Sequence, residues 1–274
     1  MAITASQVND LRKQTGAGMM DCKKALVEAD GDMEKAVDFL RKKGQKVAAK
    51  RGDNEAKEGL IYAESNGEVG YIIQLNCETD FVAKNEGFQN FVKSILEIGI
   101  KNDVSSVEEL KSLKYDEKLT VDEKIVEQIG VIGEKLELSN FAKTAANSVI
   151  AYNHPGNQLA ALVGFNKAGE AIEEAGRQVA MQVAAMNPLA LKKEGISQEV
   201  IDRELEVGKA QAIEEGKPAD LADKIAQGRL NKFFKENTLL SQDFVRDNKL
   251  TVEKFLNSVE SGLTVTEFKR FSLS

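Results

Sequence analysis

The 274-residue chain has no tryptophan, one histidine, two cysteines and three prolines. A single histidine, His154, excludes a His-rich metal site and argues against a Ser/His/Asp triad. Cys22 and Cys77 lie far apart and form no CxxC motif, so they indicate neither a zinc site nor a disulfide framework. We interpret both as buried, reduced thiols, and we expect no metal and no cofactor.

Long apolar runs are also lacking, since none approaches the about 20 residues that a membrane span needs. The polar stretch from Met1 to Asp10 resembles neither a signal peptide nor a transit peptide, so we expect a cytoplasmic protein that contacts no membrane. A net charge of −7, with four tyrosines, is a poor composition for binding nucleic acid. Residues 1–52 are nevertheless basic, which indicates a solvated face or a surface for an acidic partner.

Helical spacing dominates the N-terminal part of the chain. Thr4 and Gln7 have the spacing of a capping box, and a second helix is predicted over about 19–29. A third helix is expected to begin after Asp32 and to end at Gly44. The following residues, 46–58, are typical of a tether, although 47–51 could prolong the third helix.

The apolar period then changes from 3.6 to 2. Asn66-Gly67, between the alternating runs Leu60–Ala63 and Val69–Leu75, predicts a β-hairpin. A helix is expected over 79–100, and its apolar face contains Phe88, Phe91, Val92, Ile95, Leu96 and Ile98. Further elements are predicted as a polar helical stretch over 104–133, strands over 136–142, 148–152 and 159–165, and a helix over 170–186.

Hairpin and helix thus occur twice, with two helical runs joined by Gly216-Lys217-Pro218 inserted into the second copy. Strand-like residues return near 244–245 and 268–271. We predict an α+β fold with a two-subdomain core of antiparallel sheet and helix, and an inserted antiparallel coiled-coil hairpin. The expected boundaries are a three-helix module with its linker at 1–52, a core N-subdomain at 53–142, a core C-subdomain at 143–186 and 235–274, and the hairpin at 187–234.

The junction NCETDFVAKN, residues 76–85, is the candidate functional site. Asp80 is expected to cap the helix that starts there and to oppose the positive end of its dipole. Phe81 lies seven residues before Phe88, so the apolar face projected backward would bury it in the core. The same ring could instead be directed at another protein, and the pattern leaves both interpretations open.

Reactive chemistry has little support in the sequence. Glu78 and Asp80 beside Cys77 suggest a pair of acids, but nothing in the sequence supplies the desolvation or the partner that shifts a carboxyl pKa. No GxxxxGK[ST] is present and no GxGxxG follows a strand, so direct nucleotide binding is not expected. An enzyme that uses Cys77, Glu78 and His154 remains an alternative, and a binding-only adaptor is another.

Six segments carry a family resemblance: LRKQTGAGMMDCKKAL (11–26), NCETDFVAKNEGF (76–88), IGEKLEL (132–138), YNHPG (152–156), AMQVAAMNP (180–188) and GKPADLADKIAQGRLNKFF (216–234). Together they resemble bacterial translation elongation factor Ts, in the family's order and over nearly the whole chain. The resemblance implies a guanine-nucleotide exchange factor for elongation factor Tu, the GTPase that brings aminoacyl-tRNA to the ribosome. It also implies a UBA-like N-terminal module and no covalent catalysis, and it allows a homodimer or an assembly of two copies of each protein.

The resemblance also assigns residues. The motif that enters the GTPase near its Mg²⁺ site, to dislocate that ion, corresponds to Thr79, Asp80, Phe81 and Val82. Ile132 and Gly133 would lie against the same region of the partner, and His154 would touch another surface of it. The N-terminal residues that would dock on the nucleotide-binding domain are Arg12, Met19, Met20 and Lys23.

Two departures from the family pattern are visible. Enterobacterial members continue past the last core strand with a helical segment that contacts the GTPase, and contacts of that segment cannot be carried over here. Gln182 stands where the family often has histidine, and we infer nothing from this difference.

Overall fold

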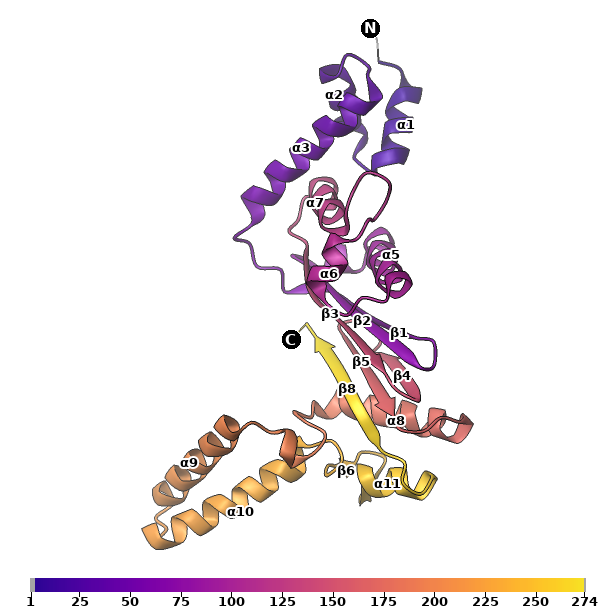
Figure 1. Ribbon diagram of the computed structural model, residues 1–274. Coiled ribbons are helices and arrows are strands. Elements are labelled where there is room, and N and C mark those ends of the chain that lie inside the picture. The colour runs from indigo at the N-terminus through magenta and orange to yellow at the C-terminus, as the bar shows by residue number, and fades with distance from the viewer. Residues whose placement is uncertain (1–2, 274) are drawn as a thin grey trace.

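The computed structural model describes residues 3–273, with the side chains of residues 219 and 220 left aside. Helices and antiparallel sheets are mixed along the chain, which confirms the predicted α+β class. Figure 1 shows a long molecule with a helical unit at the N-terminal end, sheets in the middle and a helical hairpin projecting at the other end. Between residues 3 and 273, no helix has the length and apolar character needed to cross a membrane.

Three helices form the N-terminal unit: α1 (Ala5–Thr15), α2 (Met19–Glu28) and α3 (Met33–Arg51). The predicted capping box is confirmed, because the Thr4 hydroxyl accepts the Gln7 N–H at 3.3 Å and the Gln7 side chain accepts the Thr4 N–H at 2.9 Å. The helices enclose a small core of Val8, Leu11, Ala17, Cys22, Ala25, Leu26, Ala29 and Ala36. A core of this size stabilises little by itself.

The expectation that Gly44 ends the third helix is wrong. Helix α3 continues to Arg51, and Gly44 instead faces α7 (Val121–Ile132), where a Cβ added to Gly130 would lie 2.5 Å from the Gly44 Cα. Glycine at this place allows two helix backbones to approach closely. Residues 47 and 48 pack on the core of the first sheet, so the tether is shorter than predicted.

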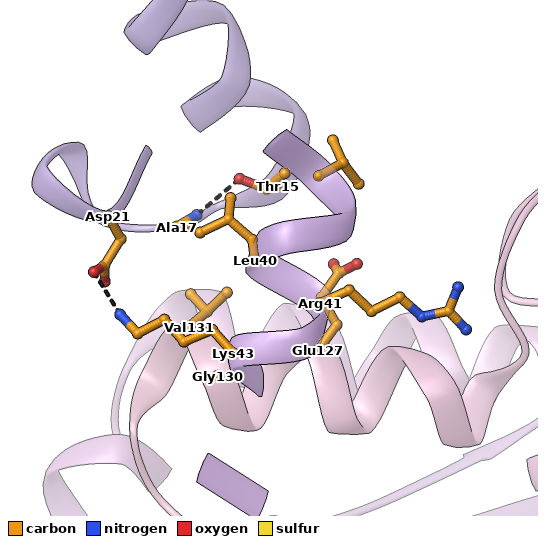
Figure 2. Close-up of a pocket in the computed structure, with 10 residues that line it drawn as sticks. Thr15, Ala17, Asp21, Leu40, Arg41, Lys43, Glu127, Gly130 and Val131 are labelled. Carbon is orange, nitrogen blue, oxygen red and sulfur yellow. Dashed lines mark hydrogen bonds and ion pairs between the residues drawn. The ribbon is translucent and has the colours of Figure 1, made fainter. Parts of the chain in front are cut away.

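Side chains around this helix crossing hold the N-terminal unit together and join it to α7. Lys43 of α3 pairs with Asp21 of α2 within the unit (Figure 2). Arg41 of α3 pairs with Glu123 of α7. Val131 of α7 packs against the N-terminal core. Contacts with α7 therefore fix the position of the N-terminal unit.

The first sheet has three antiparallel strands in the order β1-β2-β3: β1 (Glu58–Ser65), β2 (Val69–Cys77) and β3 (Glu137–Ala145). The hairpin predicted at Asn66-Gly67 is confirmed. Asn66 Oδ1 accepts the backbone N–H groups of Glu68 and Val69 at 3.1 and 2.8 Å, which closes the turn.

The single helix predicted over 79–100 is wrong, because the structure divides it into α4 (Asp80–Ala83) and α5 (Glu86–Asn102). Asn85 causes the division: its Oδ1 accepts the N–H groups of Gly87 and Phe88 at 2.9 and 3.3 Å and so starts a second helix. Most of the predicted apolar face of α5 is buried, namely Phe88, Phe91, Val92, Ile95 and Leu96.

The polar helical stretch predicted over 104–133 is also two helices, α6 (Val107–Ser112) and α7. Each begins with a capping box, from Ser106 and Thr120 respectively, and the bridge between Lys114 and Thr120 separates them. Together with α5 they cover the first sheet and bury Leu110, Val121, Ile125, Ile129 and Phe141 among others.

The second sheet has the order β4-β5-β8, with β4 (Ser148–Asn153), β5 (Leu159–Phe165) and β8 (Val265–Ser272). Its helices are α8 (Glu170–Met186) and α11 (Val252–Val259), and the remaining short elements are η1 (Lys193–Gly195), β6 (Asp243–Phe244) and β7 (Asp247–Thr251). The buried Gln182 of α8 donates to Gln242 and accepts the N–H of Val245 at 2.9 Å, so it joins α8 to the β6–β7 turn.

The two sheets pack through a shared apolar layer and one side-chain clamp. Asn153 of β4 donates to the Ala63 carbonyl and accepts the Ala63 N–H, both at 2.8 Å, so it pairs with β1 as another strand would. The layer consists of Ile61, Ala63, Ile72, Val149, Ala160 and Leu162. The sheets therefore form one continuous central body.

Between β5 and β8 in the sequence lies the helical hairpin of α9 (Gln198–Glu214) and α10 (Ala219–Asn237), which projects from the body in Figure 1. Arg229 of α10 donates to Gln211 of α9 and to Glu215, the residue that follows α9, each at 2.7 Å. Close packing of the helices at Gly208, which lies against Ala226, adds to these bonds.

We expect Gly130→Ala to destabilise the protein, because the added Cβ forces α3 and α7 apart and such overpacking costs about 1–3 kcal/mol. Urea unfolding followed by circular dichroism measures the shift in midpoint. Gly228→Ala is the matched control, since Gly228 also lies within a helix but an added Cβ meets nothing within 4 Å. Alanine there should stabilise by about 1 kcal/mol. Equal midpoints for the two variants would contradict the close crossing.

Candidate functional site

The candidate site begins where β2 ends and α4 starts. Thr79, not Asp80 as expected, is the N-cap residue, and its hydroxyl accepts the Val82 N–H at 3.4 Å. Asp80 occupies the first helical position, where its charge still opposes the helix dipole. Its carboxylate pairs with Lys84 at 2.6 Å, and the hydrogen bond from Lys84 lowers the pKa of Asp80.

Phe81 is 82% exposed, so the interpretation that it belongs to the core is wrong. The projection backward from Phe88 assumed one continuous helix, whereas α4 and α5 are separate and their faces are not in phase. Val82 and Ala83 face inward and pack against the core of the first sheet. The single turn of α4 thus anchors on two small apolar side chains and presents a large aromatic ring to solvent.

Glu134 binds the beginning of α4 from a distant part of the chain. One carboxylate oxygen accepts the Thr79 hydroxyl at 2.7 Å, and the other accepts the Thr79 N–H at 3.0 Å. Glu134 lies within the IGEKLEL segment, but nothing in its sequence surroundings indicates this contact, so sequence reasoning missed it.

Glu78, the residue before the N-cap Thr79, is also fixed by hydrogen bonds from distant residues. It accepts from Arg51 at 2.9 and 2.8 Å, from Asn54 at 3.0 Å and from the Lys135 N–H at 2.6 Å. Burial would raise the pKa of Glu78, but the bonds from Lys135, Arg51 and Asn54 outweigh it and lower that pKa. Glu78 is therefore a structural anion and not a poised acid.

Ile132 and Gly133, assigned by resemblance to the same contact region, end α7 immediately before Glu134. Gly133 has φ of 82° and its N–H donates to Ile129 at 2.8 Å, so it turns the chain out of the helix. Ile132 is half-buried against the first core. Through Glu134 and Thr79, the structure brings Ile132 and Gly133 to the corner that carries Phe81.

His154 lies elsewhere, on the exposed turn between β4 and β5. Its Nδ1 is 2.9 Å from the Tyr152 hydroxyl, and its backbone N–H donates to Leu159 at 2.9 Å. The turn is anchored on β1, because the Asn157 carbonyl accepts the Ile61 N–H at 2.7 Å. His154 is thus presented on a fixed turn, apart from the α4 corner.

The four assigned residues of the N-terminal unit are all exposed, and they include Met19 at 61% and Met20 at 75%. Arg12 belongs to α1, whereas Met20 and Lys23 share a face of α2. Val27, one turn further along that face and 55% exposed, was missed by sequence reasoning. Its spacing of seven residues from Met20 places it on the face that also carries Lys23.

The enzyme alternative meets a chemical obstacle at Cys77. Its thiol is buried and donates to the Thr79 carbonyl at 3.2 Å. Burial, and next the charge of Glu134, raise the pKa of Cys77 to about 12. A thiol with this pKa is protonated at neutral pH and is a poor nucleophile.

Known proteins resemble the chain over its length. Residues 78–274 match the family model for elongation factor TS. The chain is 51% identical to elongation factor Ts of Amoebophilus asiaticus over 273 residues, covering 98% of each protein. Identity to the elongation factor Ts of Christiangramia forsetii is 52%, covering 99% of this chain and 98% of the relative. For Porphyromonas gingivalis it is 47%, covering 100% and 99%. The chain therefore belongs to the elongation factor Ts family, whose members exchange nucleotide on a partner and do not catalyse covalent chemistry.

Proposed function

We propose that the protein binds elongation factor Tu in its GDP form, disturbs the Mg²⁺ site of that GTPase and releases GDP so that GTP can bind. The observation that carries the proposal is the exposure of Phe81, 82%, on a turn whose start is fixed from outside. A large aromatic side chain in water contributes little to folding, but burying it in a partner contributes about 1.5–3 kcal/mol. A fixed turn also loses little entropy when it binds.

The proposed mechanism needs no reacting group in this chain. A G protein holds GDP partly through Mg²⁺, which demands near-ideal octahedral geometry. Phe81 enters an apolar slot of the partner and moves the elements that support this geometry, so GDP leaves faster. Linkage then requires that GDP weaken binding of the exchange factor by the same ratio as the factor weakens binding of GDP.

The residues around Phe81 have supporting roles in this proposal. Thr79 caps the turn, Asp80 with Lys84 holds its first position, and Val82 fixes it to the core. Ile132 and Gly133 add contact area beside the ring.

Two other surfaces supply affinity at a distance from the nucleotide. His154 contacts a second face of the GTPase. The exposed side chains of α1 and α2 dock on its nucleotide-binding domain, through Arg12, Met19, Met20 and Lys23.

We expect Phe81→Ala to slow GDP release at least about 10-fold, since most of the burial free energy of the ring is lost. Stopped-flow release of fluorescent GDP from elongation factor Tu measures the rate. Val245→Ala is the matched control, because Val245 is also an exposed apolar residue, at 56%, on a different part of the molecule. Normal release by a folded Phe81→Ala protein would remove Phe81 from the mechanism, and no acceleration by the intact protein would favour the adaptor.

Substitution of Met20 should have a different effect. In the proposal, Met20 contributes binding area remote from the Mg²⁺ site, so Met20→Ala is expected to raise the half-saturating concentration of the factor about 5-fold. The maximal rate of GDP release should stay unchanged, because a contact made equally before and after the metal site is disturbed contributes to binding and not to the rate. A lower maximal rate with unchanged half-saturation would contradict this division of roles.

A further inference from the structure

Two carboxylates link the segment before α4 to the segment after α7 by hydrogen bonds. Glu134 accepts both polar hydrogens of Thr79, at 2.7 and 3.0 Å, while Glu78 accepts the N–H of Lys135 at 2.6 Å. Each segment thus supplies an acid that binds the other. Sequence distance makes this arrangement informative, since more than 50 residues separate the partners in each pair.

We propose that Glu134 is a positioning residue for nucleotide exchange, because it fixes the direction in which Phe81 leaves the molecule. This inference rests on the proposed function of Phe81 and concerns the same site. Glu134 itself need not touch the partner. It acts through Thr79, whose hydroxyl and N–H it holds at the start of the turn.

A four-residue helix cannot hold its own direction. Nucleating one turn of helix is unfavourable in isolation. The backbone bonds of α4, from Ala83 N–H to Thr79 at 3.2 Å and from Lys84 N–H to Asp80 at 3.0 Å, close a single turn, and the cap adds the 3.4 Å bond from Val82. Packing of Val82 and Ala83 holds the inner side of the turn. Two charge-assisted bonds between Glu134 and one residue, Thr79, hold the start of the turn as well.

The backbone at Gly133 places Glu134 where it can do this. Gly133 has a left-handed φ of 82°, and an added Cβ would meet nothing within 4 Å, so the requirement is for the conformation and not for space. The chain therefore turns out of α7 and directs residue 134 at the corner before α4. Lys135 then continues toward β3, where its side chain donates to the carbonyls of Gly52 and Asn54 at 2.9 and 3.0 Å.

The carboxylate of Glu78 helps to hold the segment that carries Glu134. Glu78 is bound by Arg51 at the end of α3 as well as by Lys135, so the segment that carries Glu134 is tied to a long helix. These hydrogen bonds matter for the proposed mechanism. When Phe81 pushes part of the partner aside, the partner pushes back on α4 with an equal force. If α4 moved under that force, the partner's metal site would stay intact.

The first test compares Glu134→Ala with wild type in stopped-flow GDP release from elongation factor Tu. We expect the maximal rate to fall about 10-fold while the half-saturating concentration changes little, because the contact area remains and only its direction is lost. Glu97→Ala is the matched control, since Glu97 is an exposed acid on α5 of the same part of the molecule. A wild-type maximal rate for folded Glu134→Ala would overturn the inference.

A double-mutant cycle shows whether Glu134 acts through Thr79. Thr79→Val removes the hydroxyl with little change of shape, so Glu134→Ala should cost less in that background than in wild type. If the two effects on the maximal rate simply multiply, Glu134 does not act through the Thr79 hydroxyl and the inference fails.

A third measurement does not depend on exchange. With 4-fluorophenylalanine at position 81, the fluorine resonance of the free protein should broaden or shift in Glu134→Ala and stay unchanged in Glu97→Ala. An identical resonance in Glu134→Ala would overturn the inference even if Phe81 drives exchange. Conversely, normal exchange by Phe81→Ala would refute the proposed function and leave this measurement of the turn unaffected.

Discussion

The exposure of Phe81 depends on hydrogen bonds from outside the helix that carries it. Helix α4 has four residues and would not persist alone, and Phe81 gives it no core contact. The two bonds between Glu134 and Thr79 supply from the α7–β3 connection what a longer helix supplies from its own backbone. An aromatic ring can therefore remain in water, in a fixed direction, on a very short element.

The same connection joins the candidate site to the N-terminal unit. Helix α7 ends beside α4, and α3 packs against it at the contact between Gly44 and Gly130. The end of α3 returns to the corner through Arg51 and Glu78. Two routes thus connect the unit of α1, α2 and α3 to the turn that carries Phe81, so in the proposed mechanism docking of the N-terminal surface orients the ring.

Features that depend on neighbouring residues could be predicted from the sequence, and those that depend on distant residues could not. Asn66 closes its own hairpin, so the turn was predictable. Asn85 also starts a new helix by local bonds. The apolar period of α5 nevertheless predicts one continuous helix through Asn85, and projection along that helix wrongly puts Phe81 on the buried face. Gly44 has the sequence signature of a helix end, yet its role comes from Gly130 across the interface. No local pattern indicates which carboxylate reaches the cap of α4.

In the proposed mechanism, contacts away from the partner's metal site keep the complex bound while Phe81 disturbs that site. Burial of one ring contributes about 1.5–3 kcal/mol, and part of this is offset by the distortion it causes. Met20 and His154 are both exposed, and the contacts proposed for them lie away from the nucleotide, so these contacts would not oppose GDP. Because linkage is reciprocal, any flexibility in the framework between these surfaces would lower the coupling in both directions. In this proposal, the hydrogen-bonded connection from α3 through Glu78 and Glu134 to α4 keeps the coupling high.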